Sequence, residues 1–211
     1  MRQLPTEAKR FSEVDAAWRE IMVSVEEVKG HFLSCADQKK RLEHRFISAN
    51  SKLDEVQKGL NDYLEVKRKY FPRFFFLSND ELLEIISQTK DPTAVQAHLN
   101  KAFEGISKVK FEKDLKISEM RAAKGEVVKL DEAIDPESPA NKGNVECWLL
   151  ELESMQWRTM KTHTAKGLAD YKVTKRDKWT LRWPQQVILG ASSVYWTNEV
   201  NATIAAGGSK Q

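Results

Sequence analysis

The 211-residue chain has only two cysteines, Cys35 and Cys147, and a net charge of only +3. Two distant cysteines are too few for a disulfide framework and favour a reducing compartment. The weak net charge gives no electrostatic reason to expect nucleic acid or an anionic membrane as partner. No apolar run approaches the ~20 residues that span a bilayer, and residues 1–15 hold no apolar segment of a signal peptide. We therefore expect a cytoplasmic protein that binds neither membrane nor nucleic acid.

The sequence also lacks the short motifs that carry catalysis or cofactor binding. A nucleotide-binding loop of the Gly-x-x-x-x-Gly-Lys-Ser/Thr type is absent, and backbone amides in such a loop are what hold the phosphates. The four histidines show neither zinc-type ligand spacing nor a nucleophile motif. We therefore expect no catalytic residue, no cofactor and no metal in this chain, and predict that it is not an enzyme on its own.

Helical periodicity is what the first third of the chain does contain. Apolar residues between positions 11 and 32 recur every three or four residues, which predicts an amphipathic helix. A heptad seam follows, formed by Leu42, Phe46, Ala49, Leu53, Val56, Leu60, Tyr63, Lys67 and Tyr70. We predict two long antiparallel helices joined near residues 33–40. In this interpretation the seam packs within the chain; the alternative is an intermolecular coiled coil.

Residues 71–76, Phe-Pro-Arg-Phe-Phe-Phe, place four phenylalanines beside basic residues. Pro72 should end the preceding helix, and residues 74–77 read as a short extended run. The rings could stack on nucleic-acid bases, insert into a membrane, or fill a buried hinge between two helical layers. We favour the buried hinge, because three consecutive exposed phenylalanines would promote aggregation.

Two helix starts follow the aromatic run. Ser78 and Glu81 have the spacing of a capping box. Asn79 and Asp80 lie in the first turn, where Asp80 adds negative charge at the N-terminus of a helix that buries Leu82 and Leu83. Asp91-Pro92 has the form of an N-cap followed by proline at the first helical position. Apolar residues from Val95 to Ile106 predict a further amphipathic helix.

The second half changes period. Short alternating segments around Gly125 predict two or three short strands, a β-hairpin insert over residues 108–130. Residues 131–143 hold two prolines and a glycine and form the best candidate for a flexible break. The predicted fold class is mainly α, an elongated helical bundle with a small inserted β-hairpin. Its parts are a helical subdomain over 1–107, the insert, the break, a second helical subdomain over 144–204, and a flexible tail over 205–211.

Tryptophans are concentrated in the last third of the chain. We predict that Trp179, Trp183 and Trp196 fill an interhelical core. The alternative is that one or two of them form aromatic anchors on an exposed docking face.

These residues resemble the linker region of dynein heavy chains, the axonemal ones most. The resemblance lies in "YFPRFFFLSNDELLEIISQTKDPTAVQAHLNKAFEGISKVKF" (70–111), and in "RQLPTEAKRFSEVDAAWREIM", "GEVVKLDEAI", "GNVECWLLELE" and "WPQQVILGASSVYWTNEV" in the same order. It covers about residues 2–200. The positions that carry it are Phe71, Pro72, Arg73, Phe74, Phe75, Phe76, Leu77, Ser78, Asn79, Asp80, Glu81, Leu82, Leu83, Gly125, Glu126, Trp148, Trp183, Pro184 and Trp196.

The resemblance implies a mechanical lever. In that family the linker lies across a ring of AAA+ modules, which bind ATP and Mg²⁺, and its bending drives minus-end-directed movement along microtubules. Implied partners are the AAA+ ring of the same heavy chain and, through the parent motor, intermediate and light chains and microtubules, at the cytoskeleton of the cilium axoneme. A bend would fall within 131–143 or 71–77, and we favour 131–143. The rival interpretation is a non-motor helical scaffold that uses the heptad seam.

Overall fold

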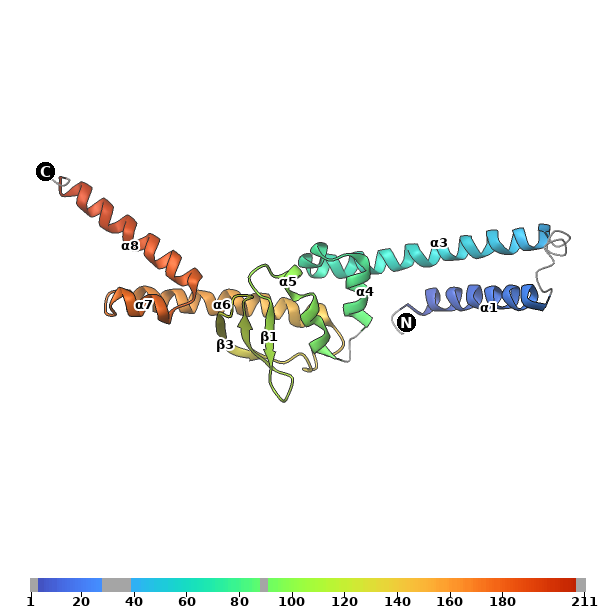
Figure 1. Ribbon diagram of the computed structural model, residues 1–211, viewed down its shortest axis with the longest axis horizontal. Helices are drawn as coiled ribbons and strands as arrows, with labels where there is room; N and C mark the ends of the chain where they lie inside the picture. Colours follow the sequence, from blue (N-terminus) through green and yellow to red (C-terminus); the bar gives the residue numbers. More distant parts are fainter. Residues whose placement is uncertain (1–3, 28–38, 88–90, 208–211) are drawn as a thin grey trace. The chain divides into compact units, whose positions relative to one another are not determined.

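The computed structural model describes residues 4–27, 39–87 and 91–207, and the fold is mainly α with a small β insertion (Figure 1). The chain divides into two compact units, residues 1–69 and 70–211. This division differs from the sequence prediction of a first subdomain ending at residue 107. The difference arises because the segments after Tyr70 make their contacts with the sheet and the helix that follow them.

The first unit consists of helix α1 (Pro5–Glu27) and helix α3 (Lys39–Tyr70, whose last residue belongs to the second unit). Three ion pairs join them: Glu20–Arg45 at 2.8 Å, Glu13–Lys52 at 2.7 Å and Arg10–Glu55 at 3.1 Å. Since the residue numbers fall along one helix as they rise along the other, the pair is antiparallel, as predicted. Residues 28–32 of the predicted first helix and most of the predicted connection 33–40 lie outside the described residues.

The helix pair buries little of its apolar seam. Ile21 is 5% exposed, but Trp18, Phe46 and Leu53 keep 52%, 41% and 37% of their surface exposed. The rings of Trp18 and Phe46 still meet, with their centroids 6.5 Å apart. Ion pairs therefore hold α1 and α3 together as much as apolar packing does.

The second unit opens with four short helical segments: the 3₁₀ helix η1 (Pro72–Phe76), helix α4 (Asn79–Ser87), the 3₁₀ helix η2 (Pro92–Ala97) and helix α5 (Leu99–Ala102). Two sequence predictions are wrong here. Residues 74–76 are 3₁₀ helix rather than extended strand, and the amphipathic helix expected over 95–106 is split at His98. The predicted N-cap is confirmed, because the Asp91 side chain accepts from the Thr93 backbone N–H at 2.9 Å.

A three-stranded antiparallel sheet follows, in the order β1 (Lys108–Phe111), β2 (Ile117–Arg121), β3 (Val127–Ile134). The β1–β2 turn contains Leu115 at φ 62°, and the β2–β3 turn contains Gly125 at φ 90°, the left-handed region that glycine adopts at little cost. One face carries the buried residues Val109 and Met120. The insert thus has three strands, within the two or three that the sequence predicts.

The third strand extends into the segment 131–143 that the sequence predicts as a flexible break. Its last residue, Ile134, is fully buried and pairs with Ile117, and the Asp131 backbone N–H donates to Thr159 Oγ1 at 3.1 Å. Residues 131–134 are therefore strand rather than linker. The rest of the connection folds into turns held by Asn141, whose amide donates to Asp135 O at 2.9 Å and to Glu151 Oε2 at 2.7 Å.

Three helices complete the unit: α6 (Val145–Tyr171), α7 (Arg176–Arg182) and α8 (Gln185–Ala205). α6 packs against β3 and against α8 (Figure 1). Its buried face consists of Val145, Trp148, Leu149, Leu152, Met155 and Thr159. The predicted second helical subdomain is thus helical over nearly all of 144–204; residues 208–211 of the predicted tail lie outside the described residues.

Candidate functional site

The aromatic run forms one side of a junction between helical segments. Phe71 and Phe74 are both fully buried and meet edge to face, with ring centroids 5.0 Å apart. Phe71 also lies 6.1 Å from the ring of Phe103, which follows α5. Such aromatic pairs add about 0.5–1.5 kcal/mol beyond the area they bury. The junction is therefore a packed core and not an open cavity.

Two of the four phenylalanines do not share this burial. Phe75 and Phe76 are 63% and 70% exposed, so the prediction that the whole run is buried is wrong for them. The reason is the period of the 3₁₀ helix, which has three residues per turn. Phe71, Phe74 and Leu77 then lie on one inward face, whereas Phe75 and Phe76 point outward.

Arg73 joins the junction to the long helix α6. Its Nε donates to Glu153 Oε1 at 2.7 Å, and its guanidinium donates to Ala102 O at 3.1 Å. The guanidinium carbon also lies 4.9 Å from the centre of the Phe103 ring. Side chains of Arg73 and Glu153 are only 33% and 27% exposed, which favours a strong charge-assisted contact. One side chain thus contacts residues from α5, α6 and the segment after α5.

The predicted capping box is present at the start of α4. The Ser78 backbone N–H donates to Glu81 Oε2 at 3.0 Å, and the Glu81 backbone N–H donates to Ser78 Oγ at 3.3 Å. Glu81 also pairs with Lys101 of α5. The hydrogen bond from Lys101, followed by the bond from the Ser78 backbone, lowers the pKa of Glu81 to about 2. Asn79 and Asp80 are exposed beside it, as expected of a first helical turn, while Leu82 is buried and Leu83 half-buried.

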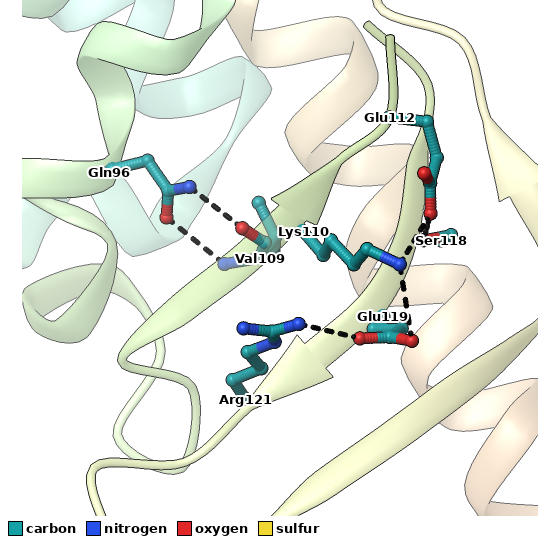
Figure 2. Close-up of polar contacts among 7 residues, drawn as sticks. All are labelled: Gln96, Val109, Lys110, Glu112, Ser118, Glu119 and Arg121. Atoms are coloured by element: carbon teal, nitrogen blue, oxygen red, sulfur yellow. Dashed lines mark hydrogen bonds and ion pairs between the residues drawn. The ribbon is translucent and has the colours of Figure 1, made fainter. Parts of the chain in front are cut away.

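Gln96 is a site residue that the sequence reasoning missed. Its side-chain amide donates to Val109 O at 2.7 Å and accepts from the Val109 N–H at 3.0 Å (Figure 2). The side chain thus occupies the outer hydrogen-bonding groups of the edge strand β1, which would otherwise be free to pair with another strand. A single glutamine in a 3₁₀ helix carries no sequence signal for this role, since its partner lies on another element.

Gly125 and Glu126 lie in the β2–β3 turn, as the sequence places them, and Glu126 has a long-range role. Its Oε1 accepts from the backbone N–H of Gln185, the first residue of α8, at 2.7 Å. Pro184, which precedes it, has no N–H of its own and provides no side-chain cap. A carboxylate at a helix N-terminus also interacts favourably with the positive end of the helix dipole. The turn of the sheet therefore caps a helix 59 residues later in the chain.

The turn between α6 and α7 is organised by Asp170. Its carboxylate accepts from Thr174 Oγ1 at 2.7 Å and from Trp183 Nε1 at 2.8 Å. These two bonds, with the charge of Arg182, lower the pKa of Asp170 against the opposing effect of burial. Trp179 is fully buried and donates from Nε1 to Gly167 O at 3.0 Å.

The tryptophans divide between the two predicted roles. Trp148 and Trp179 are buried and Trp183 is half-buried, as expected for core positions. Trp196 is 68% exposed, so its predicted burial is wrong. α8 packs through Val187 and Ala191, and Trp196 lies on the other side of the helix. Trp157 of α6, which the sequence reasoning did not single out, is also 72% exposed.

No three His, Cys, Asp or Glu side chains within residues 4–27, 39–87 and 91–207 lie close enough to hold a metal ion. Over the same residues, no helix is long and apolar enough to cross a membrane. Among the predicted motif residues, Phe71, Phe74 and Trp148 lie in the core, whereas Phe75, Phe76 and Trp196 are exposed.

Residues 1–167 match the family model of the dynein heavy chain, N-terminal region 2. The chain belongs to the dynein heavy chain family. It is 47% identical over 206 residues to dynein axonemal heavy chain 1 of Mus musculus, and 44% identical over 203 residues to dynein axonemal heavy chain 3 of Homo sapiens. These matches cover 98% and 96% of this chain but only 5% of each relative.

A third relative, dynein axonemal heavy chain 12 of Rattus norvegicus, is 42% identical over 207 residues, again with 98% of this chain and 7% of the relative covered. The resemblance noted from the motifs is thereby confirmed: the chain corresponds to part of the N-terminal region of axonemal dynein heavy chains. It spans about a twentieth of the length of the first two curated relatives.

Proposed function

We propose that this chain is part of the linker of an axonemal dynein heavy chain, the lever that couples ATP hydrolysis in an AAA+ ring to movement along a microtubule. The ring of the same heavy chain binds ATP and Mg²⁺ in this proposal, and this chain carries force without catalysis. Intermediate chains, light chains and microtubules are partners through the whole motor. The kinship with axonemal heavy chains supports a place in the cytoskeleton of the cilium.

The observation that carries the proposal is the Arg73 junction. A lever must resist deformation between the point where force enters and the point where it leaves. Arg73 ties η1 to α5 and to α6 through the bond to Glu153, the bond to Ala102 O and the contact with Phe103. α6 is 27 residues long, and packed long helices are stiff along their axis. The junction thus fixes short segments onto a long rigid helix.

The test uses the complete heavy chain carrying Arg73→Met and Glu153→Met together. Both changes keep the volume of the side chains and remove the charged contact. We expect microtubule gliding to slow by about threefold or more, while ATP hydrolysis without microtubules stays within about twofold.

A matched control removes the exposed ion pair between Arg158 and Glu132, 2.6 Å apart on α6 and β3, with Arg158→Met and Glu132→Met. Exposed pairs contribute about 0–1 kcal/mol, so gliding should not change. Unchanged gliding in the Arg73/Glu153 variant, or an equal loss in the control, would show that the junction does not transmit force.

The predicted bend within 131–143 is part of the proposal and has its own test. Only residues 135–143 lie outside regular elements, so a bend would be confined to them. A disulfide engineered across this connection in the complete motor should abolish gliding and spare basal ATP hydrolysis. Gliding that persists in the oxidised motor would place the bend elsewhere.

A non-motor scaffold is the second candidate, because Trp18 and Phe46 of the helix pair remain about half exposed. In that case the heptad seam would bind a helix from another chain. Light scattering during size-exclusion chromatography separates the two: a stable oligomer that persists on dilution favours the scaffold, and a monomer favours the linker.

A further inference from the structure

The outer face of the sheet is defined by two rows of side chains that cross all three strands. The rows are Lys108–Arg121–Val127 and Lys110–Glu119–Lys129. Side chains alternate between the two faces of a strand, and the residues between these positions, Val109 and Met120, are buried. The outer face is therefore the one turned away from the core, and Figure 2 shows Lys110, Glu119 and Arg121 on it.

The one carboxylate within these rows is already neutralised. Glu119 accepts from the Arg121 guanidinium at 3.0 Å and lies 3.6 Å from Lys110 Nζ, and its side chain is only 12% exposed. Lys110 also pairs with Glu112 at 2.9 Å, and Glu112 in turn accepts from Ser118 Oγ at 2.6 Å (Figure 2). These acidic groups are committed to neighbours on the same sheet and balance Lys110 and Arg121.

The remaining cations of this face are not paired with a carboxylate within the described residues. Lys108 and Lys129 are exposed on the two edge strands, and Lys124 is exposed in the β2–β3 turn. None of the three makes an ion pair within the part of the chain that the structure describes. Asp131, exposed further along β3, makes none either. Lys108, Lys110, Arg121, Lys124 and Lys129 thus share this surface with four carboxylates, those of Glu112, Glu119, Glu126 and Asp131, which leaves a surplus of one positive charge.

We propose that the outer face of the sheet docks an acidic segment of another polypeptide, whose Asp and Glu side chains reach Lys108 and Lys129. Strands lie about 4.8 Å apart and residues rise about 3.4 Å along a strand, so these two lysines, two strands and two residues apart, are separated by roughly 12 Å, a span that one extended segment covers. Val127, 49% exposed and two residues from Lys129 on the same strand, offers an apolar contact. The proposal is independent of the lever function.

An acidic polypeptide fits this surface better than a nucleic acid does. Duplex DNA carries one charge per ~1.7 Å, and a phosphate chain of that density would lie against Glu119 and Asp131 as well as the lysines. Single-stranded nucleic acid needs aromatic rings for stacking, and this face has none among its row residues. A polypeptide can space its carboxylates to meet the lysines and avoid the two acidic side chains.

The test measures binding of the 211-residue chain to a fluorescein-labelled 20-residue peptide of alternating glutamate and serine, by fluorescence anisotropy at about 50 and 200 mM salt. We expect binding at the lower salt that weakens at the higher, because exposed charge pairs are screened. Lys108→Glu with Lys129→Glu should weaken it by about tenfold or more through charge reversal.

The matched control is Lys161→Glu with Lys166→Glu, two exposed lysines of α6, which changes the net charge by the same amount. Circular dichroism checks that both variants are folded. The proposal is overturned if the peptide does not bind at low salt, or if the control weakens binding equally. It is also overturned if a 20-nucleotide oligothymidine or vesicles with 30% phosphatidylserine bind more tightly than the peptide.

Discussion

Gln96 shows how one side chain can complete the edge of a sheet. Its amide makes two hydrogen bonds to Val109, one to the N–H and one to the carbonyl, so both outward groups of that residue are satisfied. Val109 is itself buried. Unpartnered polar groups cost most where water cannot replace the lost partner.

We expect Gln96→Ala to lower the free energy of unfolding by about 1–3 kcal/mol, because it leaves two partly buried backbone groups without partners. Urea unfolding followed by circular dichroism measures the change. Gln186→Ala, at an exposed position of α8, is the control and should stay within about 0.5 kcal/mol. A Gln96→Ala variant as stable as the control would mean that water replaces the amide.

Glu81 makes the stability of the α4–α5 region depend on pH in a defined direction. Its pKa is about 2 in the folded chain against an ordinary value of 4.5. The unfolded chain therefore binds more protons between these values, and the stabilisation is present above about pH 4.5 and lost as the pH falls toward 2.

We expect the thermal midpoint of the chain to fall on acidification from about pH 5 to about pH 2.5, and to fall less in Glu81→Gln, which cannot titrate. Calorimetry at a series of pH values measures this, and NMR titration of the Glu81 carboxyl reports its pKa directly. Glu104→Gln, at an exposed position, is the control and should keep the wild-type slope. An identical slope in Glu81→Gln would contradict the lowered pKa.

The crossing of α6 and α8 depends on the absence of a side chain at Gly167. A Cβ built there would lie 2.5 Å from Val187 Cγ1, closer than real Cβ contacts come. The carbonyl of Gly167 also accepts from the buried Trp179 indole. A shift of the backbone to relieve the clash would therefore disturb that hydrogen bond as well.

We expect Gly167→Ala to destabilise the chain by about 1–3 kcal/mol through overpacking. Adding Val187→Ala should recover part of the loss, because it removes the methyl group that clashes. Gly190→Ala in α8 faces open space and should instead stabilise by about 0.5–1 kcal/mol, as alanine is the better helix former. Denaturant titrations of the three variants and the wild type measure these changes, and equal effects at both glycines would exclude the packing explanation.

How far the sequence predicts these elements depends on whether the cause is local. Helix periodicity, the effect of Pro72 and the capping box at Ser78 and Glu81 act within a few residues, and the structure confirms all three. The 3₁₀ turn of 72–76 was missed because four clustered aromatic residues suit a strand as well as a tight helix. The third strand extends to Ile134 because Ile117 and Thr159, distant in sequence, provide its partners.

The site residues divide in the same way. Ser78 and Glu81 could be assigned from their spacing, but the roles of Arg73, Gln96 and Glu126 depend on partners 80, 13 and 59 residues away. The sequence favoured burial of Trp196 because of its large apolar ring and left exposure only as the alternative, and its place on α8, on the other side from Val187 and Ala191, accounts for the exposure observed. Recognition of a family came from long motifs and not from any one of these contacts.

Across the whole chain, burial is distributed very unevenly between the two units. Of the buried hydrophobic residues among those described, only Ile21 and Leu64 belong to residues 1–69, and all others lie in 70–211. Local stability follows the density of buried apolar contacts. The helix pair α1–α3 is therefore the less protected part of the molecule.

We expect hydrogen exchange with mass spectrometry to show faster exchange over residues 5–27 and 39–60 than over 145–167, because less buried apolar surface resists opening there. The comparison is internal, so no variant is needed. Exchange at equal rates in α1 and α6 would contradict the expectation and would point to a partner helix held on the seam.

The contact between Glu126 and the first amide of α8 has a mechanical consequence. A force applied near Ala205 acts on a helix of 21 residues whose first residue is hydrogen-bonded to the β2–β3 turn. A load on α8 is therefore shared between the sheet, through the turn that holds Glu126, and α6, on which α8 packs.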